Sequence, residues 1–324
     1  MDLIFLGTGA GKPSRERNVA GLALSFLPAR NEWWLFDCGE ATQHQVMKVG
    51  LSLHRLTRVY ITHLHGDHIY GLPGLLTSRS AEGSTARLTL YGPEGLRRWI
   101  EETMLCSSTH LTYPLSIEEA PSPAEREEGT SADWVVEALG DVTVKASWLN
   151  HVIPSLGYRL EQSDSPGNLL VNALREQRIP PGPVYGRLKR GETVRLEDGR
   201  IIHGAGFIGP PKRGITLCIL GDTSPTQSAQ RLAQRADVVV HEATFDASLE
   251  ENANRFGHST APQAAAAAER ANAKSLVLTH ISSRYQGATA HDLLESARSI
   301  FPQTFLASDG ARFVLGTHGV SPIR

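Results

Sequence analysis

A seven-residue segment, THLHGDH at Thr62–His68, constrains this chain more than any other part of its 324 residues. It follows a short apolar run and concentrates four side chains that can bind a metal ion: His63, His65, Asp67 and His68. In an extended segment, side chains two residues apart point the same way, so His63 and His65 can hold one ion. A glycine then bends the chain, and Asp67 and His68 can reach a second ion. The segment therefore predicts a metal centre at the end of a strand.

The remaining ligands of such a centre stand where three other apolar runs end. VTVKASWLNH ends at His151, ITLCILGD ends at Asp222 and SLVLTH ends at His280. The carboxyl ends of neighbouring strands meet at one edge of an α/β sheet, and loops converge there to form sites. A carboxylate such as Asp222 can bridge two ions about 3.5–4 Å apart. We therefore expect His151, Asp222 and His280 to complete the centre.

The donor types of this set indicate the metal. It offers five imidazoles and two carboxylates but no thiolate, and imidazole suits zinc, copper, iron and nickel. We expect two zinc ions per subunit as the cofactor. Manganese and iron stay open as alternatives, because ligand type narrows the choice of metal without deciding it.

Short β-rich runs recur along the chain, with helical patterns between several of them, which predicts an α/β fold. One helix is expected from Ala261 to about Ala273, because Thr260 and Gln263 have capping-box spacing and Pro262 would lie in the first turn. The predicted strands are Leu3–Leu6, Trp33–Phe36, Val59–Thr62, Leu88–Tyr91, Val142–Trp148, Ile215–Leu220, Val238–His241, Ser275–Thr279 and Arg312–Leu315.

Composition excludes several classes of protein. Three cysteines without a CxxC pair suit neither a disulfide framework nor a thiolate zinc site, and Cys38 and Cys218 read as buried residues of apolar strands. No signal peptide is recognisable, and no apolar stretch reaches the ~20 residues of a membrane helix. We expect a soluble cytoplasmic protein. The net charge of -2 argues against a uniformly basic nucleic-acid-binding surface.

The charge is nevertheless unevenly distributed. The stretch from Glu118 to Asp141 has eight acidic residues and one basic residue, whereas Arg175–Arg213 has nine basic and four acidic ones. Within the basic stretch, IPPGPVYGRLKRGE is rich in Pro and Gly and poor in core-forming residues, which indicates a protruding arm. We expect residues 1–324 to form a single domain, with residues 161–212 inserted as this arm.

The HxHxDH motif at His63–His68, together with His151, Asp222 and His280, resembles the metallo-β-lactamase superfamily. That resemblance implies a four-layer αβ/βα sandwich with a dinuclear metal site in the cleft between its halves. Further segments resemble the ribonuclease Z family of tRNA 3′-processing endonucleases, over nearly the whole chain. They are FLGTGAGKPSRERN at Phe5–Asn18, LFDCGEATQHQ at Leu35–Gln45, YGLPGLLTSRS at Tyr70–Ser80, HEATF at His241–Phe245, GHST at Gly257–Thr260 and HISSRYQG at His280–Gly287.

The resemblance implies a reaction and roles for three residues. The enzyme would remove the 3′ trailer from precursor tRNA, leaving a 3′-hydroxyl on the tRNA and a 5′-phosphate on the trailer. Asp67 would both bind a metal and accept the proton of the attacking water. His258 would protonate the departing 3′-oxygen, and Glu242 would orient His258 and favour its charged form.

The resemblance also implies how RNA is bound. The arm would hold the body of the tRNA, with Arg187, Lys189 and Arg190 contacting phosphates irrespective of sequence. Arg284, four residues after His280, is placed to contact an RNA phosphate near the metals. The family is homodimeric, so a homodimer is expected, with precursor tRNA as the substrate.

Two other functions compete with this one. A metallohydrolase of small esters, lactones or phosphodiesters would use the same site and leave the basic arm without a role. A non-catalytic RNA-binding member would lack a metal ligand, and none is missing. Whether precursors that encode CCA are cut or spared depends on the shape of the pocket.

Overall fold

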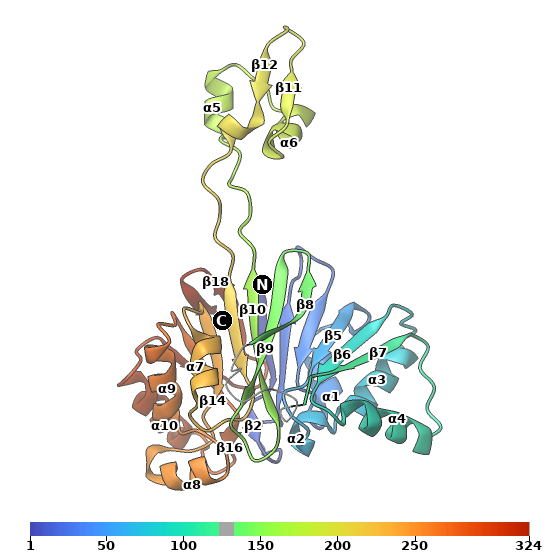
Figure 1. The fold of residues 1–324 in the computed structure, drawn as a ribbon, viewed down its shortest axis with the longest axis vertical. Helices are drawn as coiled ribbons and strands as arrows, with labels where there is room; N and C mark the ends of the chain where they lie inside the picture. Colours follow the sequence, from blue (N-terminus) through green and yellow to red (C-terminus); the bar gives the residue numbers. More distant parts are fainter. Residues whose placement is uncertain (123–132, 324) are drawn as a thin grey trace.

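The computed structural model of the protein describes residues 1–122 and 133–323. Two β-sheets lie face to face, helices cover their outer faces, and an arm projects far from both sheets (Figure 1). In spatial order, the first sheet contains β19 (Gly319–Pro322), β18 (Arg312–Gly316), β1 (Asp2–Gly7), β3 (Gly21–Ser25), β4 (Trp33–Phe36), β5 (Leu56–Tyr60), β6 (Leu88–Gly92) and β7 (Leu115–Glu119). The second contains β17 (Thr304–Leu306), β15 (Leu276–Thr279), β14 (Val238–Glu242), β13 (Thr216–Leu220), β10 (Ser155–Gln162), β9 (Val142–Leu149) and β8 (Trp134–Leu139).

Each sheet is antiparallel in one part and parallel in the other. In the first sheet the strands from β4 to β7 pair in parallel, and in the second those from β13 to β17 do. Parallel strands end at a common edge, so the segments that follow β5, β13, β14 and β15 can converge. A short parallel pair, β2 (Gly9–Ala10) with β16 (Ile281–Ser282), joins the two halves of the chain.

Apolar side chains form one core between the sheets and one beneath each helical layer. Phe5, Trp34 and Tyr60 of the first sheet belong to the same buried cluster as Tyr158 and Val240 of the second. The first outer layer contains α1 (Thr42–Lys48), α3 (Leu72–Ala81) and α4 (Leu96–Cys106), and the second contains α7 (Gln227–Ala233), α9 (Ala261–Arg270) and α10 (Ala288–Arg298). The predicted four-layer α/β sandwich is thus confirmed.

All nine predicted strands are present, with small differences at their ends. The strand expected to reach Thr62 ends at Tyr60, because the Thr62 backbone N–H and hydroxyl donate to Asp37 instead of to a neighbouring strand. Helix α9 begins at Ala261 as predicted, and the capping box is present: Gln263 N–H donates to Thr260 Oγ1 and Thr260 N–H donates to Gln263 Oε1. It ends at Arg270, before the expected Ala273, since Asn272 has a positive φ of 51°.

The arm is folded around a small core of its own. Beyond β10, two extended stretches lead to α5 (Val171–Glu176), α6 (Pro183–Lys189), β11 (Thr193–Arg195), β12 (Ile201–His203) and the 3₁₀-helix η3 (Gly204–Phe207). Its buried apolar residues are Leu174, Ile179, Leu188, Val194, Ile202 and Phe207. The first two residues of the expected range 161–212 still belong to β10.

The Pro/Gly-rich segment lies in the arm and forms α6, and the turn between β11 and β12 lies farthest from the sheets (Figure 1). Pro183 stands in the first turn of α6, where the missing N–H of proline costs the helix no hydrogen bond.

Cys38 and Cys218 are buried as expected, while Cys106 is exposed, and all three are free thiols. Of the acidic stretch, Glu125, Glu127 and Glu128 lie outside the described residues. In the described part of the chain, no helix combines the length and apolar character needed to cross a membrane.

Candidate metal centre

The seven predicted metal ligands converge at the edge where the parallel strands of both sheets end. His63 and His65 follow β5, and Asp67 and His68 lie in the short helix α2 (Gly66–Ile69). The other three follow strands of the second sheet: His151 comes two residues after β9, Asp222 two after β13 and His280 directly after β15. Segments that directly follow strands therefore supply five of the seven positions, and α2 supplies the other two.

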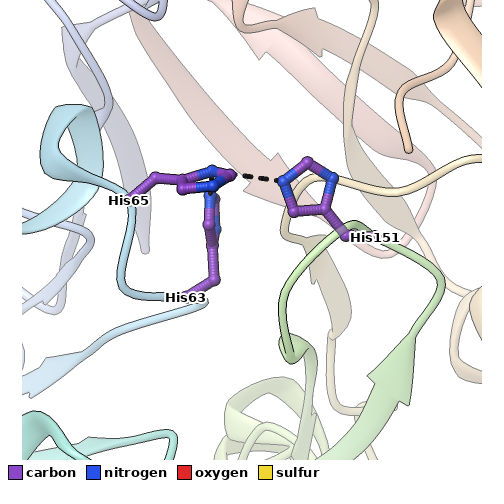
Figure 2. Close-up of side chains that lie close together, drawn as sticks. All are labelled: His63, His65 and His151. Carbon is purple, nitrogen blue, oxygen red and sulfur yellow. Dashed lines mark hydrogen bonds between the residues drawn. The ribbon is translucent and has the colours of Figure 1, made fainter. Parts of the chain in front are cut away.

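Three histidines form the first cluster. Figure 2 shows the rings of His63, His65 and His151 converging from two separate segments of the chain. His65 Nδ1 lies 3.1 Å from His63 Nε2 and 3.2 Å from His151 Nε2. Three ring nitrogens facing one point at such short distances are the arrangement that a single bound cation requires.

Asp67, His68 and His280 form the second cluster. His280 Nε2 lies 3.2 Å from His68 Nε2 and 3.3 Å from Asp67 Oδ2, and Asp67 Oδ2 lies 3.6 Å from His68 Nε2. The Gly11 backbone N–H donates to Asp67 Oδ2 at 2.7 Å, which the positive φ of 70° at Gly11 allows. These three side chains also have the spacing of a cation site.

Asp222 lies between the two clusters. Its Oδ2 atom is 3.7 Å from His63 Nε2, 3.6 Å from His68 Nε2 and 3.4 Å from His280 Nε2. One carboxylate oxygen thus approaches ring nitrogens of both clusters, which is the position of a bridging ligand.

Hydrogen bonds at the outer ring nitrogens direct the inner nitrogens towards the centre. His68 Nδ1 donates to Asp37 Oδ2 at 2.8 Å, and His63 Nδ1 lies 3.0 Å from the Thr62 hydroxyl. The Thr62 hydroxyl donates its own proton to Asp37, so it can only accept from His63. When both rings are neutral, as metal binding requires, Nε2 of each histidine carries a lone pair that faces the other ligands.

The histidines of the second sheet are held in the same way. His151 Nδ1 donates to the Gly257 carbonyl at 2.8 Å. His280 Nδ1 lies 3.0 Å from the Thr244 hydroxyl, which donates to Glu242 Oε2 at 2.6 Å and so accepts from His280. Histidine ligands of metals characteristically have such partners at the second ring nitrogen.

The charges of the cluster suit divalent cations. Burial lowers the pKa of His63 well below its usual value and also lowers the pKa of His65 and His151, so these rings are neutral. Burial would raise the pKa of Asp67 and Asp222, but the neighbouring histidines outweigh it and both pKa values are lowered. Burial would lower the pKa of His68, but the carboxylates of Asp222 and Asp37 outweigh it and raise this pKa well above its usual value, so a bound cation would displace the proton of His68. The imidazoles and ionised carboxylates together form the donor set that zinc takes.

A further histidine, in the segment just before α9, lies at the rim of the centre. His258 Nδ1 is 3.0 Å from Glu242 Oε1 and 3.7 Å from Asp222 Oδ2. Burial lowers the pKa of His258, but the charge and hydrogen bond of Glu242 overcome this effect and raise the pKa to about 9. His258 is therefore an imidazolium at neutral pH, unlike the rings of the first cluster.

The most important residue that sequence reasoning missed is Asp37. It directly follows β4, so the rule that found His151, Asp222 and His280 at strand ends would also have found it. Asp37 has a positive φ of 56° and is only 7% exposed. Its carboxylate accepts from the backbone and hydroxyl of Thr62 as well as from His68, and thereby orients part of both clusters.

The expected RNA-contact residues lie in two places. Arg284 is exposed, with its guanidinium carbon 5.9 Å from the centre of the Phe245 ring, and that ring lies 6.1 Å from the ring of His258. Arg284 therefore stands near the metal centre. Arg187 and Arg190 lie in the arm and not at the metal centre. Both form ion pairs with Glu192: Arg187 Nε lies 2.9 Å from Oε2 and Arg190 Nε lies 2.7 Å from Oε1. Lys189 is the last residue of α6, which also contains Arg187, and Arg190 directly follows the helix.

Two facing sheets between helical layers, with histidines and aspartates gathered at one shared edge, define a metal-binding protein of the metallo-β-lactamase fold. The chain is 50% identical over 309 residues to ribonuclease Z of Bacillus licheniformis, a match that covers 95% of this chain and 97% of that protein. Identity and coverage are the same for ribonuclease Z of Bacillus cereus. Residues 1–163 match the family model described as Anti-Pycsar protein Apyc1. The chain belongs to the ribonuclease Z family and, through residues 1–163, to the family of that model.

Solved structures agree with this assignment. The short form of human tRNase Z aligns with a TM-score of 0.70 and 32% identity, over 98% of this chain and 100% of that one. The metallo-β-lactamase fold protein YhfI of Bacillus subtilis aligns with a TM-score of 0.65 and 18% identity, over 96% of this chain and 98% of that one. The second match supports the fold alone.

Proposed function

We propose that the chain is a metal-dependent endoribonuclease that removes the 3′ trailer from precursor tRNA, leaving a 3′-hydroxyl on the tRNA and a 5′-phosphate on the trailer. One observation carries this proposal. The chain combines a phosphodiesterase-like cluster of histidines and aspartates with a basic arm that has its own core and projects away from that cluster. A small substrate would occupy only the cleft, whereas a tRNA is large enough to reach both.

We propose two metal ions. His63, His65 and His151 would hold one, Asp67, His68 and His280 would hold the other, and Asp222 would touch both. Bound divalent ions polarise phosphoryl oxygens and favour the ionisation of water. Zinc is the proposed metal because the donors are imidazoles and carboxylates, and analysis of the purified protein would distinguish it from manganese or iron.

The residues of the chain supply the proton transfers. In the proposed reaction a water oxygen bonds to the scissile phosphorus while the bond from phosphorus to the tRNA 3′-oxygen breaks. Asp67, an ionised carboxylate held by the Gly11 N–H, takes the proton of the water. His258, charged because of Glu242, gives its proton to the departing 3′-oxygen.

RNA binding is divided between the cleft and the arm. We propose that Arg284 contacts a phosphate near the scissile bond, since it lies on the Phe245 side of His258. Arg187, Lys189 and Arg190 would contact phosphates of the tRNA body. Glu192 pairs with both arginines, so their two guanidinium groups lie close together near the C-terminal end of α6.

We also propose a homodimer in which the arm of one subunit serves the site of the other. A subunit interface would cover apolar side chains that the outer layer of the first sheet exposes, of which Met47 is 72% exposed and Leu105 is 74% exposed. Sedimentation of the purified protein tests the oligomeric state. Three free thiols suit a reducing compartment, and we keep the expectation of a cytoplasmic protein.

Incubation with an unprocessed tRNA transcript tests the function directly. We expect one cut after the discriminator region, and mapping that end on precursors with and without encoded CCA would also define which precursors are cut. If the protein hydrolyses bis(p-nitrophenyl) phosphate but leaves the transcript intact, it is a small-substrate metallohydrolase and the endonuclease proposal is wrong.

A further inference from the structure

The arm leaves the second sheet at its root, where Asp164, Arg213 and Gly214 lie. Two extended stretches, residues 163–170 and 208–215, connect the sheets to the folded end of the arm and form its stem. Instead of a continuous ladder they form two isolated bridges, Ser165 with Lys212 and Leu169 with Ile208. A stem of this kind bends easily, so a small rotation where it leaves the sheets moves the far end by a large distance.

A buried carboxylate fastens the returning stretch of the stem to the second sheet. Asp237, directly before β14, has a fully buried side chain whose Oδ2 atom accepts from the Thr216 backbone N–H at 2.9 Å. Its Oδ1 atom pairs with Arg213 and, at 2.9 Å, with Lys274. The Asp237 N–H donates in turn to the Thr216 carbonyl at 2.8 Å. The first residue of β13 is thus held from both sides.

Arg213 and Lys274 make the same two contacts from different parts of the chain. Both pair with Asp237 Oδ1, and both donate to the Thr317 carbonyl in the turn between β18 and β19. Arg213 belongs to the stem, whereas Lys274 lies in the connection between α9 and β15. Only the first of the two cations therefore ties the arm to the body.

The outgoing stretch is attached to the returning one at the same level. The Gly214 N–H donates to Asp164 Oδ1 at 2.9 Å, and a Cβ atom at Gly214 would lie 1.8 Å from the Gln162 carbonyl oxygen. The two stretches therefore touch backbone to backbone beside Arg213, and a contact that holds one of them holds both.

We propose that Asp237 and Arg213 are positioning residues for precursor tRNA: the ion pair between the buried Asp237 carboxylate and the half-exposed Arg213 sets the angle of the arm, so that a tRNA bound there presents its 3′ end to the metal centre. This inference rests on the proposed function, because it assigns the arm to the tRNA body. An arm and a metal centre held in a fixed geometry, here across the two subunits of the proposed dimer, bind one substrate with a high effective concentration, and a loosened root lowers that concentration. Asp237 and Arg213 would act through the arm and not on the reacting atoms.

The test compares two matched variants, Arg213→Ala and Lys274→Ala, with precursor tRNA and with bis(p-nitrophenyl) phosphate as substrates. Each variant removes one half-exposed cation from the same carboxylate oxygen and the same carbonyl. We expect Arg213→Ala to raise KM for the precursor about tenfold with kcat unchanged. Lys274→Ala should leave KM unchanged, and neither should alter hydrolysis of the small substrate. An equal rise of KM in both variants would overturn the proposal, since the ion pair would then act through the stability of the body.

A third variant, Asp237→Asn, separates anchoring from a direct phosphate contact. It leaves Arg213 in place, so a rise of KM like that of Arg213→Ala supports the positioning role. Arg213 binds RNA itself, and the proposal is wrong, if two results are found together. Only Arg213→Ala raises KM, and in this variant the dependence of the logarithm of the binding constant on the logarithm of the salt concentration weakens by the amount that corresponds to about one phosphate contact.

Replacement of residues 180–191 by a Gly/Ser linker distinguishes the failure of this inference from that of the proposed function. If the linker variant loses processing while all three root variants keep the wild-type KM, the arm binds tRNA but its root does not need the ion pair. If the linker variant itself processes precursors normally, the role of the arm is refuted together with this inference.

Discussion

Glu242 Oε1 lies 3.0 Å from His258 Nδ1, and the carboxylate is 1% exposed while the imidazole is 17% exposed. The Thr223 backbone N–H and the Thr244 hydroxyl also donate to Glu242, at 2.8 and 2.6 Å, so the carboxylate is held on three sides. With Nδ1 engaged, Nε2 is the ring atom left to carry a proton to the substrate. The pair thus joins a buried anion to a proton donor at the rim of the metal centre.

The first prediction concerns His258 itself. His258→Ala should lower kcat for precursor tRNA about 100-fold to 10,000-fold, because the departing 3′-oxygen loses its proton donor. Bound metal, measured by elemental analysis, should stay at the wild-type level. His291→Ala is the matched control, since His291 is an exposed residue of α10, and it should leave kcat unchanged. Loss of metal from His258→Ala would reassign His258 as a ligand.

The second prediction is a pH dependence. Glu242 raises the pKa of His258 to about 9, so the ring is protonated below that pH and the rate should fall as the pH rises through it. Glu242→Gln removes the negative charge, and the pKa of His258 should drop. The alkaline fall in kcat should therefore begin at a lower pH in this variant. Profiles that coincide would show that another group controls the alkaline limb.

The third prediction concerns metal content. Asp222 approaches ring nitrogens of both clusters, so Asp222→Asn should weaken both metal positions and not one alone. Elemental analysis after dialysis should show a loss of more than one ion per chain, together with loss of activity. Asp198→Asn, an exposed residue of the arm, should retain the full metal content. Loss of a single ion from Asp222→Asn would mean that this carboxylate serves only one position.

The fourth prediction concerns Asp37, which touches no expected metal position but orients His68. Asp37→Asn keeps the size of the side chain and tolerates the positive φ, yet it removes the charge that holds the ring. We expect metal affinity to fall about 10-fold to 100-fold in a chelator competition titration, with little change in the melting temperature. An unchanged affinity would show that His68 is oriented without Asp37.

The fifth prediction concerns charge on the arm. The triple variant Arg187→Ala, Lys189→Ala, Arg190→Ala keeps the buried Leu188 and thus the core of the arm. It should weaken precursor binding and flatten its dependence on salt, because each lost phosphate contact removes counterion release. Hydrolysis of bis(p-nitrophenyl) phosphate should be unchanged. If hydrolysis of the small substrate falls equally, these residues support the body of the protein instead.

Much of the metal centre could be predicted because its signals are local. His63 to His68 lie within one turn and short helix, and His151, Asp222 and His280 each end an apolar strand, so strand periodicity alone indicated that they meet. Asp37 obeys the same rule and lies in the family-like segment LFDCGEATQHQ, but no role was assigned to it because no histidine stands beside it. The partners of the outer ring nitrogens, such as the Gly257 carbonyl, were beyond prediction because backbone groups have no sequence signature.

For the arm, too, the sequence predicted some features and not others. Its charge and its Pro/Gly content indicated a segment outside the main core, but the same residues suggested a turn where the chain forms α6. Burial of Leu188 against the other five residues of the arm core stabilises that helix, and such contacts join residues far apart in the sequence.

The amino-acid sequence by itself determined the chemistry of this protein: which donors exist, that none is a thiolate, and that they follow strands, because side-chain type and strand periodicity are local properties. Only the tertiary structure decided the spatial relationships. It set the distances of Asp222 to both clusters and the burial of Glu242 beside His258, two relationships that the sequence only suggested, and it tied Arg213 to Asp237 at the root of the arm, which nothing in the sequence indicated. Each of these contacts joins segments separated along the chain, and its strength depends on burial that arises only when the two sheets pack together.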